Sequence, residues 1–193
     1  MDLCPPAFAD QELYDNTIQL INKFKINKIY ETGSYVGKSA LILSRIDTNI
    51  KVFSYEINPQ YYGLAVRTCN GQSNVLIRNI SSQIGLKEDI VEADNNTLLF
   101  LDAHWEEYWP VLDELEVIIN KKLKPCILIH DFFVPDENGK AKFGYDAYKD
   151  QPLSFEYIKQ KIEQIYQSDY SYFYSQKGGM DVRGVIYIYP TYK

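Results

Sequence analysis

The stretch "IYETGSYVGKSALIL", residues 29–43, decides how this 193-residue chain is best interpreted. An apolar run leads into Glu31, Gly33 and Gly37, and a second apolar run of helical character follows. Two closely spaced glycines let a chain turn tightly and approach a ligand closely. The letters Gly-Lys-Ser are also the end of the phosphate-binding loop of nucleotide hydrolases. The stretch therefore indicates either a triphosphate site or the glycine turn of another nucleotide-like cofactor.

The spacing of the glycines argues against a triphosphate site. A phosphate-binding loop has four residues between its first glycine and Gly-Lys, but only three separate Gly33 from Gly37, and Thr32 stands where the first glycine is required. Glu31 suits a cationic or hydroxyl-bearing ligand. Nineteen residues after Gly37, the next predicted strand ends in Glu56, where doubly wound folds bind ribose hydroxyls. A P-loop nucleotide hydrolase or kinase is kept as the alternative.

Strand and helix patterns alternate along the rest of the chain. Short apolar runs predict buried strands, amphipathic runs predict the helices between them, and the last two strands form a hairpin. The pattern is typical of a doubly wound α/β fold with a mostly parallel, seven-stranded sheet and a C-terminal antiparallel hairpin. We expect one domain over 1–193, with an N-terminal helical segment (1–27) and a candidate lid loop (133–152). The predicted strands cover 27–33, 51–57, 74–79, 97–103, 126–132, 170–176 and 184–190.

Charge and composition narrow the choice of partners. The net charge of −6 and the pI near 5.0 argue against a nucleic-acid groove, which needs a basic surface. No apolar run approaches the ~20 residues of a membrane span, and the N-terminus lacks a basic-then-apolar signal. Three widely spaced cysteines indicate reduced thiols. We expect a cytoplasmic protein without nucleic-acid or membrane partners, and a homodimer stays open.

The segments "YETGSYVGKS" (30–39) and "SYEIN" (54–58), with the strand order and the terminal hairpin, resemble the class I S-adenosylmethionine-dependent methyltransferases. The resemblance implies a Rossmann-like fold and S-adenosyl-L-methionine as cofactor. It implies that the glycine loop lies against the methionine part, that an acid approaches its cationic end, and that a second acid binds the ribose. The implied residues are Gly33, Ser34 and Gly37 for the methionine part, Glu31 for the cationic end and Glu56 for the ribose. Asn79 and Ser81 would lie at the adenine, and Asp102 would also border the cofactor.

Polar clusters follow the fourth and fifth predicted strands, where ligands bind in open α/β sheets. They contribute Asp102, His104, His130 and Asp131 as candidate catalytic residues. Adjacent strand ends should bring the two aspartates close together. A hydroxyl acceptor is a weak nucleophile that needs a base, for which histidine has a suitable pKa, or a metal bound by two carboxylates. His130 could equally be a buried structural histidine.

Aromatic side chains surround these clusters. Trp105, Tyr108 and Trp109 are predicted to wall the acceptor or adenine pocket, although core packing would explain them as well. In the long loop, "FGYDAY" could cover the acceptor, or Tyr145 and Tyr148 could simply anchor the loop.

The segments "FLDAHWEEYWPVLDEL" (100–115) and "ILIHDF" (127–132) resemble the catechol-type, metal-dependent small-molecule O-methyltransferases. That resemblance implies Asp102 and Asp131 as ligands of a divalent metal such as Mg²⁺. The chain departs from the motif by the insertion of Ala103 and by Phe132 where an amide or acid ligand is expected, so Asp136 or a water would have to supply the third ligand.

The resemblance implies O-methylation of a small hydroxylated acceptor, such as a sugar or a secondary metabolite. No Asn/Asp-Pro-Pro-aromatic motif follows the fourth strand, which speaks against amino-methylation of nucleobases. A non-catalytic relative that only binds the cofactor is the second alternative.

Overall fold

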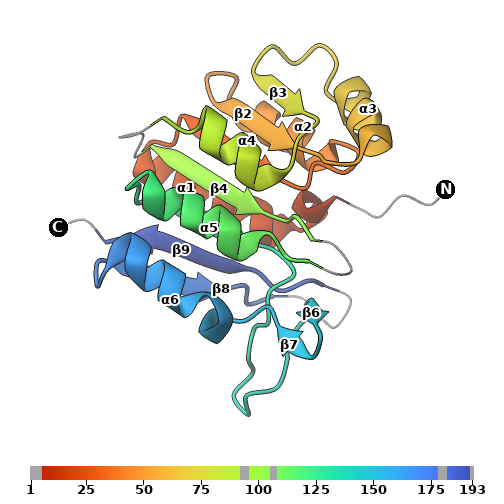
Figure 1. Cartoon of the computed structure of the whole chain (residues 1–193). Helices are drawn as coiled ribbons and strands as arrows, with labels where there is room; N and C mark the ends of the chain where they lie inside the picture. Colours follow the sequence, from red (N-terminus) through yellow and green to blue (C-terminus); the bar gives the residue numbers. More distant parts are fainter. Residues whose placement is uncertain (1–5, 92–95, 105–107, 178–181, 192–193) are drawn as a thin grey trace.

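A computed structural model describes residues 6–91, 96–104, 108–177 and 182–191. Its centre is a seven-stranded sheet with the order β3-β2-β1-β4-β5-β9-β8 (Figure 1). The first five strands run parallel, and β9 lies antiparallel between β5 and β8. This confirms the predicted fold class, including the terminal hairpin. The strands are β1 (Lys28–Thr32), β2 (Lys51–Tyr55), β3 (Val75–Arg78), β4 (Thr97–Leu101), β5 (Cys126–Ile129), β8 (Tyr170–Tyr174) and β9 (Ile186–Pro190).

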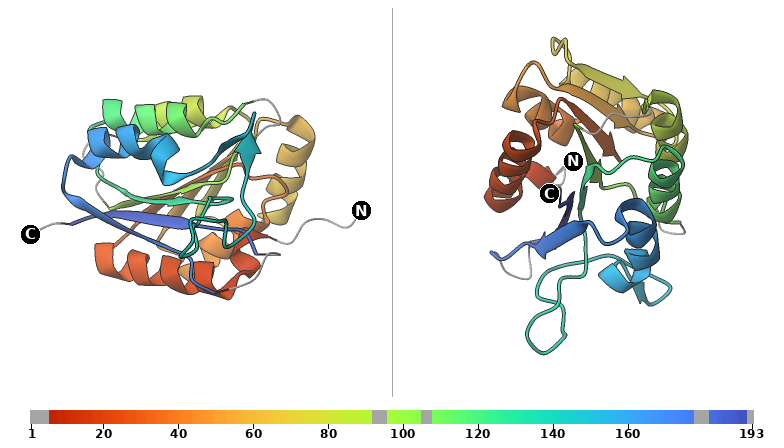
Figure 2. Two further views of the ribbon diagram at one scale, coloured as in Figure 1. Left: turned by 90° about the horizontal axis from the view of Figure 1, so that it is seen from below. Right: turned by 90° about the vertical axis from the view of Figure 1, so that its left-hand side faces the viewer.

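Helices cover both faces of the sheet, which produces three layers (Figure 2). One hydrophobic cluster joins the sheet to α4, α5 and α6, and another joins it to η1, α1 and α2. Strands β4 and β5 are buried along their whole length, as parallel strands between two helical layers should be. The helices are η1 (Ala7–Ala9), α1 (Gln11–Phe24), α2 (Lys38–Ile46), α3 (Pro59–Thr68), α4 (Ser82–Asp89), α5 (Val111–Asn120) and α6 (Phe155–Tyr166).

Local sequence signals explain where helices begin. Asp10 caps α1, since its carboxylate accepts the N–H groups of Glu12 at 2.8 Å and Leu13 at 3.4 Å. Asn58 caps α3 in the same way, and Pro59 takes the first helical position, where a missing N–H does no harm. None of the described helices combines the length and apolar character that crossing a membrane would require.

The segment predicted as a lid loop has structure of its own. It leaves the sheet after β5, extends beyond the layers and contains a small hairpin of β6 (Ala147–Tyr148) and β7 (Gln151–Pro152) (Figure 1). The sequence did not predict this hairpin, because two-residue strands are too short to show alternation. Its base is tied to the chain just after β5, where the Asp146 N–H donates to the Asp131 carbonyl at 2.8 Å. That the segment closes over a ligand stays a prediction.

Candidate active site

The glycine loop joins β1 to α2 with two residues that only glycine fits. Gly33 and Gly37 have φ angles of 81° and 78°, in the region that side chains disfavour. A Cβ on Gly33 would lie 2.7 Å from the Asp102 carbonyl oxygen, and one on Gly37 would lie 2.8 Å from the Ala65 Cα. The loop therefore brings the end of β1 against the end of β4 and leaves no room for a larger residue.

Four backbone N–H groups of this loop donate to acceptors inside the protein. Two of them donate to the Tyr55 carbonyl at 3.0–3.1 Å, one donates to a loop carbonyl at 2.7 Å, and one donates to the Glu56 carboxylate at 2.7 Å. A phosphate cradle needs such groups turned toward the ligand. The structure therefore agrees with the spacing argument against a P-loop. The four donors are Gly33, Ser34, Gly37 and Tyr35.

Glu31 is buried beneath the loop, with 1% of its surface exposed. Its carboxylate accepts the hydroxyl of Ser54. The pKa of Glu31 is raised to about 8. Burial is the main cause, the hydrogen bond from Ser54 opposes it, and the nearby carboxylates of Asp102 and Glu56 add to it. A cationic ligand beside such a buried acid would stabilise its ionised form, because a neighbouring positive charge favours the carboxylate.

The residues predicted for ribose and adenine gather at the ends of β2 and β3. Glu56 is 8% exposed, and its carboxylate accepts the Asn58 N–H at 2.8 Å. The side-chain amide of Asn79 donates to the Glu56 carbonyl at 2.7 Å and the Ile57 carbonyl at 3.1 Å. Ser81 stands at the N-cap of α4 without a capping hydrogen bond from its hydroxyl.

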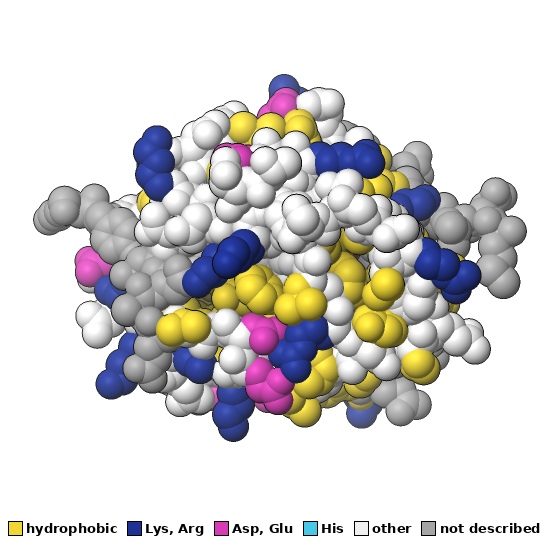
Figure 3. Space-filling view, turned by 90° about the horizontal axis from the view of Figure 1, so that it is seen from above, with side chains coloured by type: hydrophobic (Ala, Val, Ile, Leu, Met, Phe, Trp, Pro, Cys, Tyr) yellow, Lys and Arg dark blue, Asp and Glu magenta, His cyan; other side chains and the backbone are white. Residues whose placement is uncertain are grey.

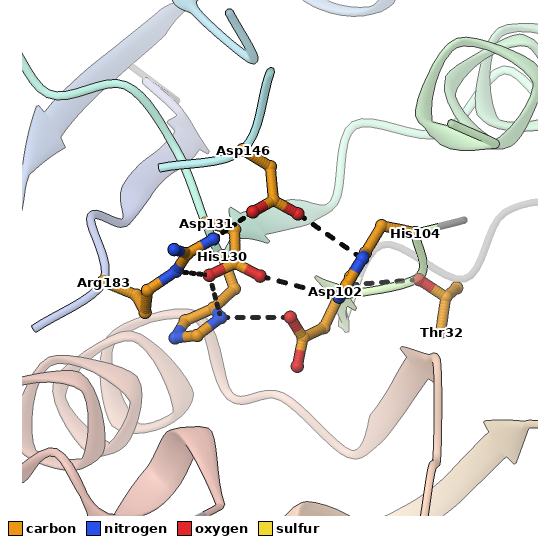
Figure 4. A network of polar contacts seen from close by, with 7 residues as sticks. All are labelled: Thr32, Asp102, His104, His130, Asp131, Asp146 and Arg183. Atoms are coloured by element: carbon orange, nitrogen blue, oxygen red, sulfur yellow. Dashed lines mark hydrogen bonds and ion pairs between the residues drawn. The ribbon is translucent and has the colours of Figure 1, made fainter. Parts of the chain in front are cut away.

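The ends of β4 and β5 form a cluster of charged side chains (Figure 4). The Nδ1 atom of His130 lies 3.0 Å from an Asp102 carboxylate oxygen and 3.4 Å from an Asp131 carboxylate oxygen. Burial alone would lower the pKa of His130, but the two carboxylates outweigh burial and raise it well above its ordinary value. The Nδ1 atom of His130 therefore lies between the two aspartates, which the structure brings together as adjacent strand ends should be.

Two further residues complete this cluster, and the sequence did not single them out. The guanidinium of Arg183, just before β9, pairs with the carboxylates of both Asp131 and Asp146 (Figure 4). Burial opposes ionisation of Asp131, but His130 and Arg183 hold its pKa below the usual range. Neither new residue belongs to a recognisable motif, because the loop and the hairpin that carry them meet only in the folded chain.

His104 lies at the open side of the cluster. It is 56% exposed, and its Nδ1 and Nε2 atoms lie 3.4 Å from an Asp146 oxygen and 3.8 Å from an Asp131 oxygen. The backbone of Asp131 has a φ of 55°, which is unusual for a residue with a side chain. Such strained positions cluster at functional sites.

A shallow, solvent-open pocket lies against these side chains. Trp109, Val111 and Leu153 supply an apolar wall, and Tyr148 packs against Trp109 with 6.0 Å between ring centroids. Trp109 borders this pocket and also belongs to the buried core cluster, so both explanations of it fit the structure, whereas Tyr108 is 42% exposed. Trp105 lies outside the described residues.

Glu114 in α5 also borders the pocket, and the sequence did not point to it. It is 1% exposed, and among the described residues neither of its carboxylate oxygens has a hydrogen-bond partner. Burial raises the pKa of Glu114 to about 7, although the nearby hydroxyls of Ser82 and Thr32 lower it somewhat. The only sequence signal was an acid in the first turn of a helix, which is common for reasons of helix stability.

The cluster does not fit the divalent metal that the catechol-type resemblance implies. Two triads, Asp102–His130–Asp131 and His104–Asp131–Asp146, each bring three potential ligand atoms within 4.8 Å. However, the two triads share Asp131, whose carboxylate is already paired with the guanidinium of Arg183.

The expected third ligand is also absent from the cluster. Phe132 is fully buried and stacks near Tyr174 with 6.3 Å between ring centroids. Asp136 uses its carboxylate for a turn, where it accepts the N–H groups of Asn138 and Lys140 at 2.8 Å each. Neither residue therefore completes a metal site.

Comparison with known proteins identifies the fold of the chain. No protein-family model and no curated protein sequence matches the chain. Among solved structures, an rRNA methylase from Streptococcus thermophilus aligns with a TM-score of 0.59 and 10% identity, over 92% of this chain and 96% of that one. A Staphylococcus aureus protein assigned as a caffeoyl-CoA O-methyltransferase aligns with a TM-score of 0.57 and 15% identity, over 92% and 82%.

A third structure, an assigned methyltransferase from Streptococcus mutans, was solved in complex with S-adenosylhomocysteine. It aligns with a TM-score of 0.60 and 11% identity, over 92% of this chain and 97% of that one. Identities this low carry the fold and not the substrate. The chain has the class I fold of the S-adenosylmethionine-dependent methyltransferases.

Proposed function

We propose that this protein is an S-adenosylmethionine-dependent methyltransferase that O-methylates a small hydroxylated acceptor. The observation that carries the proposal is the juxtaposition of two features. A glycine loop with no room for a side chain covers the buried acid Glu31, and its Gly33 lies directly against Asp102 at the rim of the acidic pocket. A cofactor seat and an acceptor pocket would thus share one border.

The residues around the loop fit the cofactor part by part. Gly33, Ser34 and Gly37 would lie against the methionine portion, and Glu31 would pair with its ammonium group. Glu56 would bind the ribose, and Asn79 and Ser81 would lie near the adenine. When bound, the cofactor would supply a methyl group already activated by its sulfonium charge.

On the acceptor side, His104 is the best-placed base. It is exposed at the pocket, and a carboxylate oxygen of Asp146 lies 3.4 Å from its Nδ1 atom, which would orient the ring. The acceptor oxygen would bond to the methyl carbon while the carbon–sulfur bond breaks and its electron pair stays on sulfur. The acceptor proton would pass to His104. Asp102 and His130 would line the pocket next to the acceptor.

A small acceptor agrees better with the surface than a nucleic acid does. The pocket carries several carboxylates, which repel a phosphate backbone. On the face at the β3 edge, basic side chains are scattered among hydrophobic and acidic ones and do not form a continuous stripe (Figure 3).

Titration calorimetry with S-adenosylhomocysteine tests the cofactor site. We expect wild-type protein to bind it and the Gly33→Arg variant not to, since a side chain there would collide with the Asp102 carbonyl. Gly71→Arg is the matched control, because Gly71 also has a positive φ but has open space around it. Both variants should first show a cooperative thermal transition.

Absence of wild-type binding at millimolar ligand would refute the proposal. Turnover of a panel of sugars and phenols then tests the acceptor class. Cofactor binding without any turnover would identify a non-catalytic relative instead.

A further inference from the structure

The position of Arg183 is set by close packing on both sides. The next residue, Gly184, has no room for a side chain, since a Cβ would lie 2.1 Å from the Phe132 carbonyl oxygen. The Phe132 N–H donates to the Gly184 carbonyl at 2.8 Å, and the Gly184 N–H donates to the Gly144 carbonyl at 2.8 Å. The backbone that carries Arg183 is thus held between the end of β5 and the long loop.

From this position the guanidinium joins two carboxylates that come from different segments. Asp131 follows β5, and Asp146 lies in the long loop just before β6. Each gives one oxygen to Arg183, and the second oxygen of each faces His104. A divalent cation bound here would lie beside a permanent positive charge and would compete with it for the same oxygens.

We propose that Arg183 occupies the carboxylates of Asp131 and Asp146 in place of a divalent cation, so that this pocket works without a metal. The inference rests on the proposed function for its catalytic meaning, but the occupation of the acidic cluster by Arg183 can be tested without turnover. The guanidinium would hold the carboxylates of Asp131 and Asp146, which line the pocket, in place beside His104. A planar guanidinium suits this role because it stays charged at all accessible pH values.

The test measures binding of Mn²⁺ alone by electron paramagnetic resonance. Wild-type protein should not bind Mn²⁺ in the range of about 10⁻⁴ to 10⁻³ M, whereas Arg183→Ala should bind it there, because it frees carboxylate oxygens that prefer hard cations. Arg183→Lys should stay metal-free, since it keeps the charge. Arg78→Ala is the matched control, because Arg78 also pairs with two acids, Glu88 and Asp89, away from the pocket.

Two results would overturn the inference. One is one-to-one Mn²⁺ binding by the wild type that Asp131→Asn removes, and the other is a folded Arg183→Ala protein that gains no Mn²⁺ affinity. If Arg183→Ala fails to fold, the Arg183→Met variant is used instead, because it removes the positive charge and keeps most of the side-chain volume. Activity that survives chelator treatment is the expected companion result. Failure of the proposed function would appear separately, as absence of S-adenosylhomocysteine binding.

Discussion

Two buried acids, Glu31 and Glu114, define the chemistry at the scale of single residues. Both are 1% exposed, and burial raises the pKa of each to a value near neutrality. A buried carboxyl group is stable in the folded protein mainly in its neutral form. Each of these residues therefore responds to pH or to a ligand cation in a way that an exposed acid does not.

The binding of S-adenosylhomocysteine should release a proton through Glu31. With a pKa of about 8, Glu31 is protonated in the free protein at pH 7, and pairing with the ligand ammonium requires its ionised form. Affinity should therefore rise from pH 6 to pH 8, by at most about tenfold per pH unit. Calorimetry in buffers of different ionisation enthalpy would measure the proton, and Glu31→Gln should abolish its release. A proton count of zero in wild type would contradict this role.

Glu114 should make the protein less stable as pH rises. Its folded pKa of about 7 exceeds the ordinary value of 4.5, so between these values the folded state holds a proton that the unfolded state has lost. The free energy of unfolding then falls with rising pH, by roughly 1–3 kcal/mol for this group. Glu114→Gln should therefore gain stability relative to wild type between pH 5 and pH 8.

Urea denaturation at pH 5 and at pH 8 measures the stability of Glu114→Gln relative to wild type. Glu156→Gln, at an exposed position of α6, should show no such pH-dependent change. A Glu114→Gln effect that is equal at both pH values would show that Glu114 is ionised, and paired, in the folded protein.

At the scale of elements, the glycine loop controls how α2 and α3 approach each other. A Cβ on Gly37 would meet the backbone of Ala65 in α3 at 2.8 Å, and Cys69 at the end of α3 has its sulfur 3.4 Å from the Gly37 carbonyl oxygen. The two helices thus pack across a position where the chain has no side chain. The loop is therefore a packing element as well as a candidate cofactor seat.

Gly37→Ala should destabilise the protein more than an ordinary glycine substitution does. It adds a collision with the Ala65 backbone to the strain of a positive φ, for a loss of about 2–4 kcal/mol. Gly139→Ala is the control, because Gly139 has a φ of 76° but open space around it and should lose only about 1 kcal/mol. Equal losses in the two variants, measured by urea denaturation, would show that α3 moves freely to accommodate the methyl group.

At the scale of the whole molecule, most of the fold could be predicted from local pattern. The five parallel strands are short runs rich in apolar residues, and a helix separates each of them from the next, so the period of hydrophobic residues distinguishes strands from helices. Asp10 and Asn58 cap α1 and α3 through hydrogen bonds to N–H groups within three residues, which is a signal that a local sequence can carry. The hairpin β6–β7 was missed because it depends on tertiary contacts.

The candidate site also contains residues that local pattern predicts and residues that only tertiary contacts bring in. Asp102, His104, His130 and Asp131 could be predicted together because ligands bind at the carboxyl ends of parallel strands. Arg183, Asp146 and Glu114 could not, because they come from a hairpin connection, a loop and a helix without any motif. The guanidinium that pairs with Asp131 is 52 residues away along the chain, so no motif around Asp102 or Asp131 records this competitor for a cation.

The sequence by itself determined the sheet, the two helical layers and the position of the glycine loop. These follow from hydrophobic period, capping and glycine spacing, which act over a few residues. Only the tertiary structure decided the charge state and the partners of the site. Burial sets the pKa values of Glu31 and Glu114, and the return of the chain beside β5 carries Arg183 to Asp131. Desolvation and ion pairing depend on which distant segments meet, and no local pattern records that.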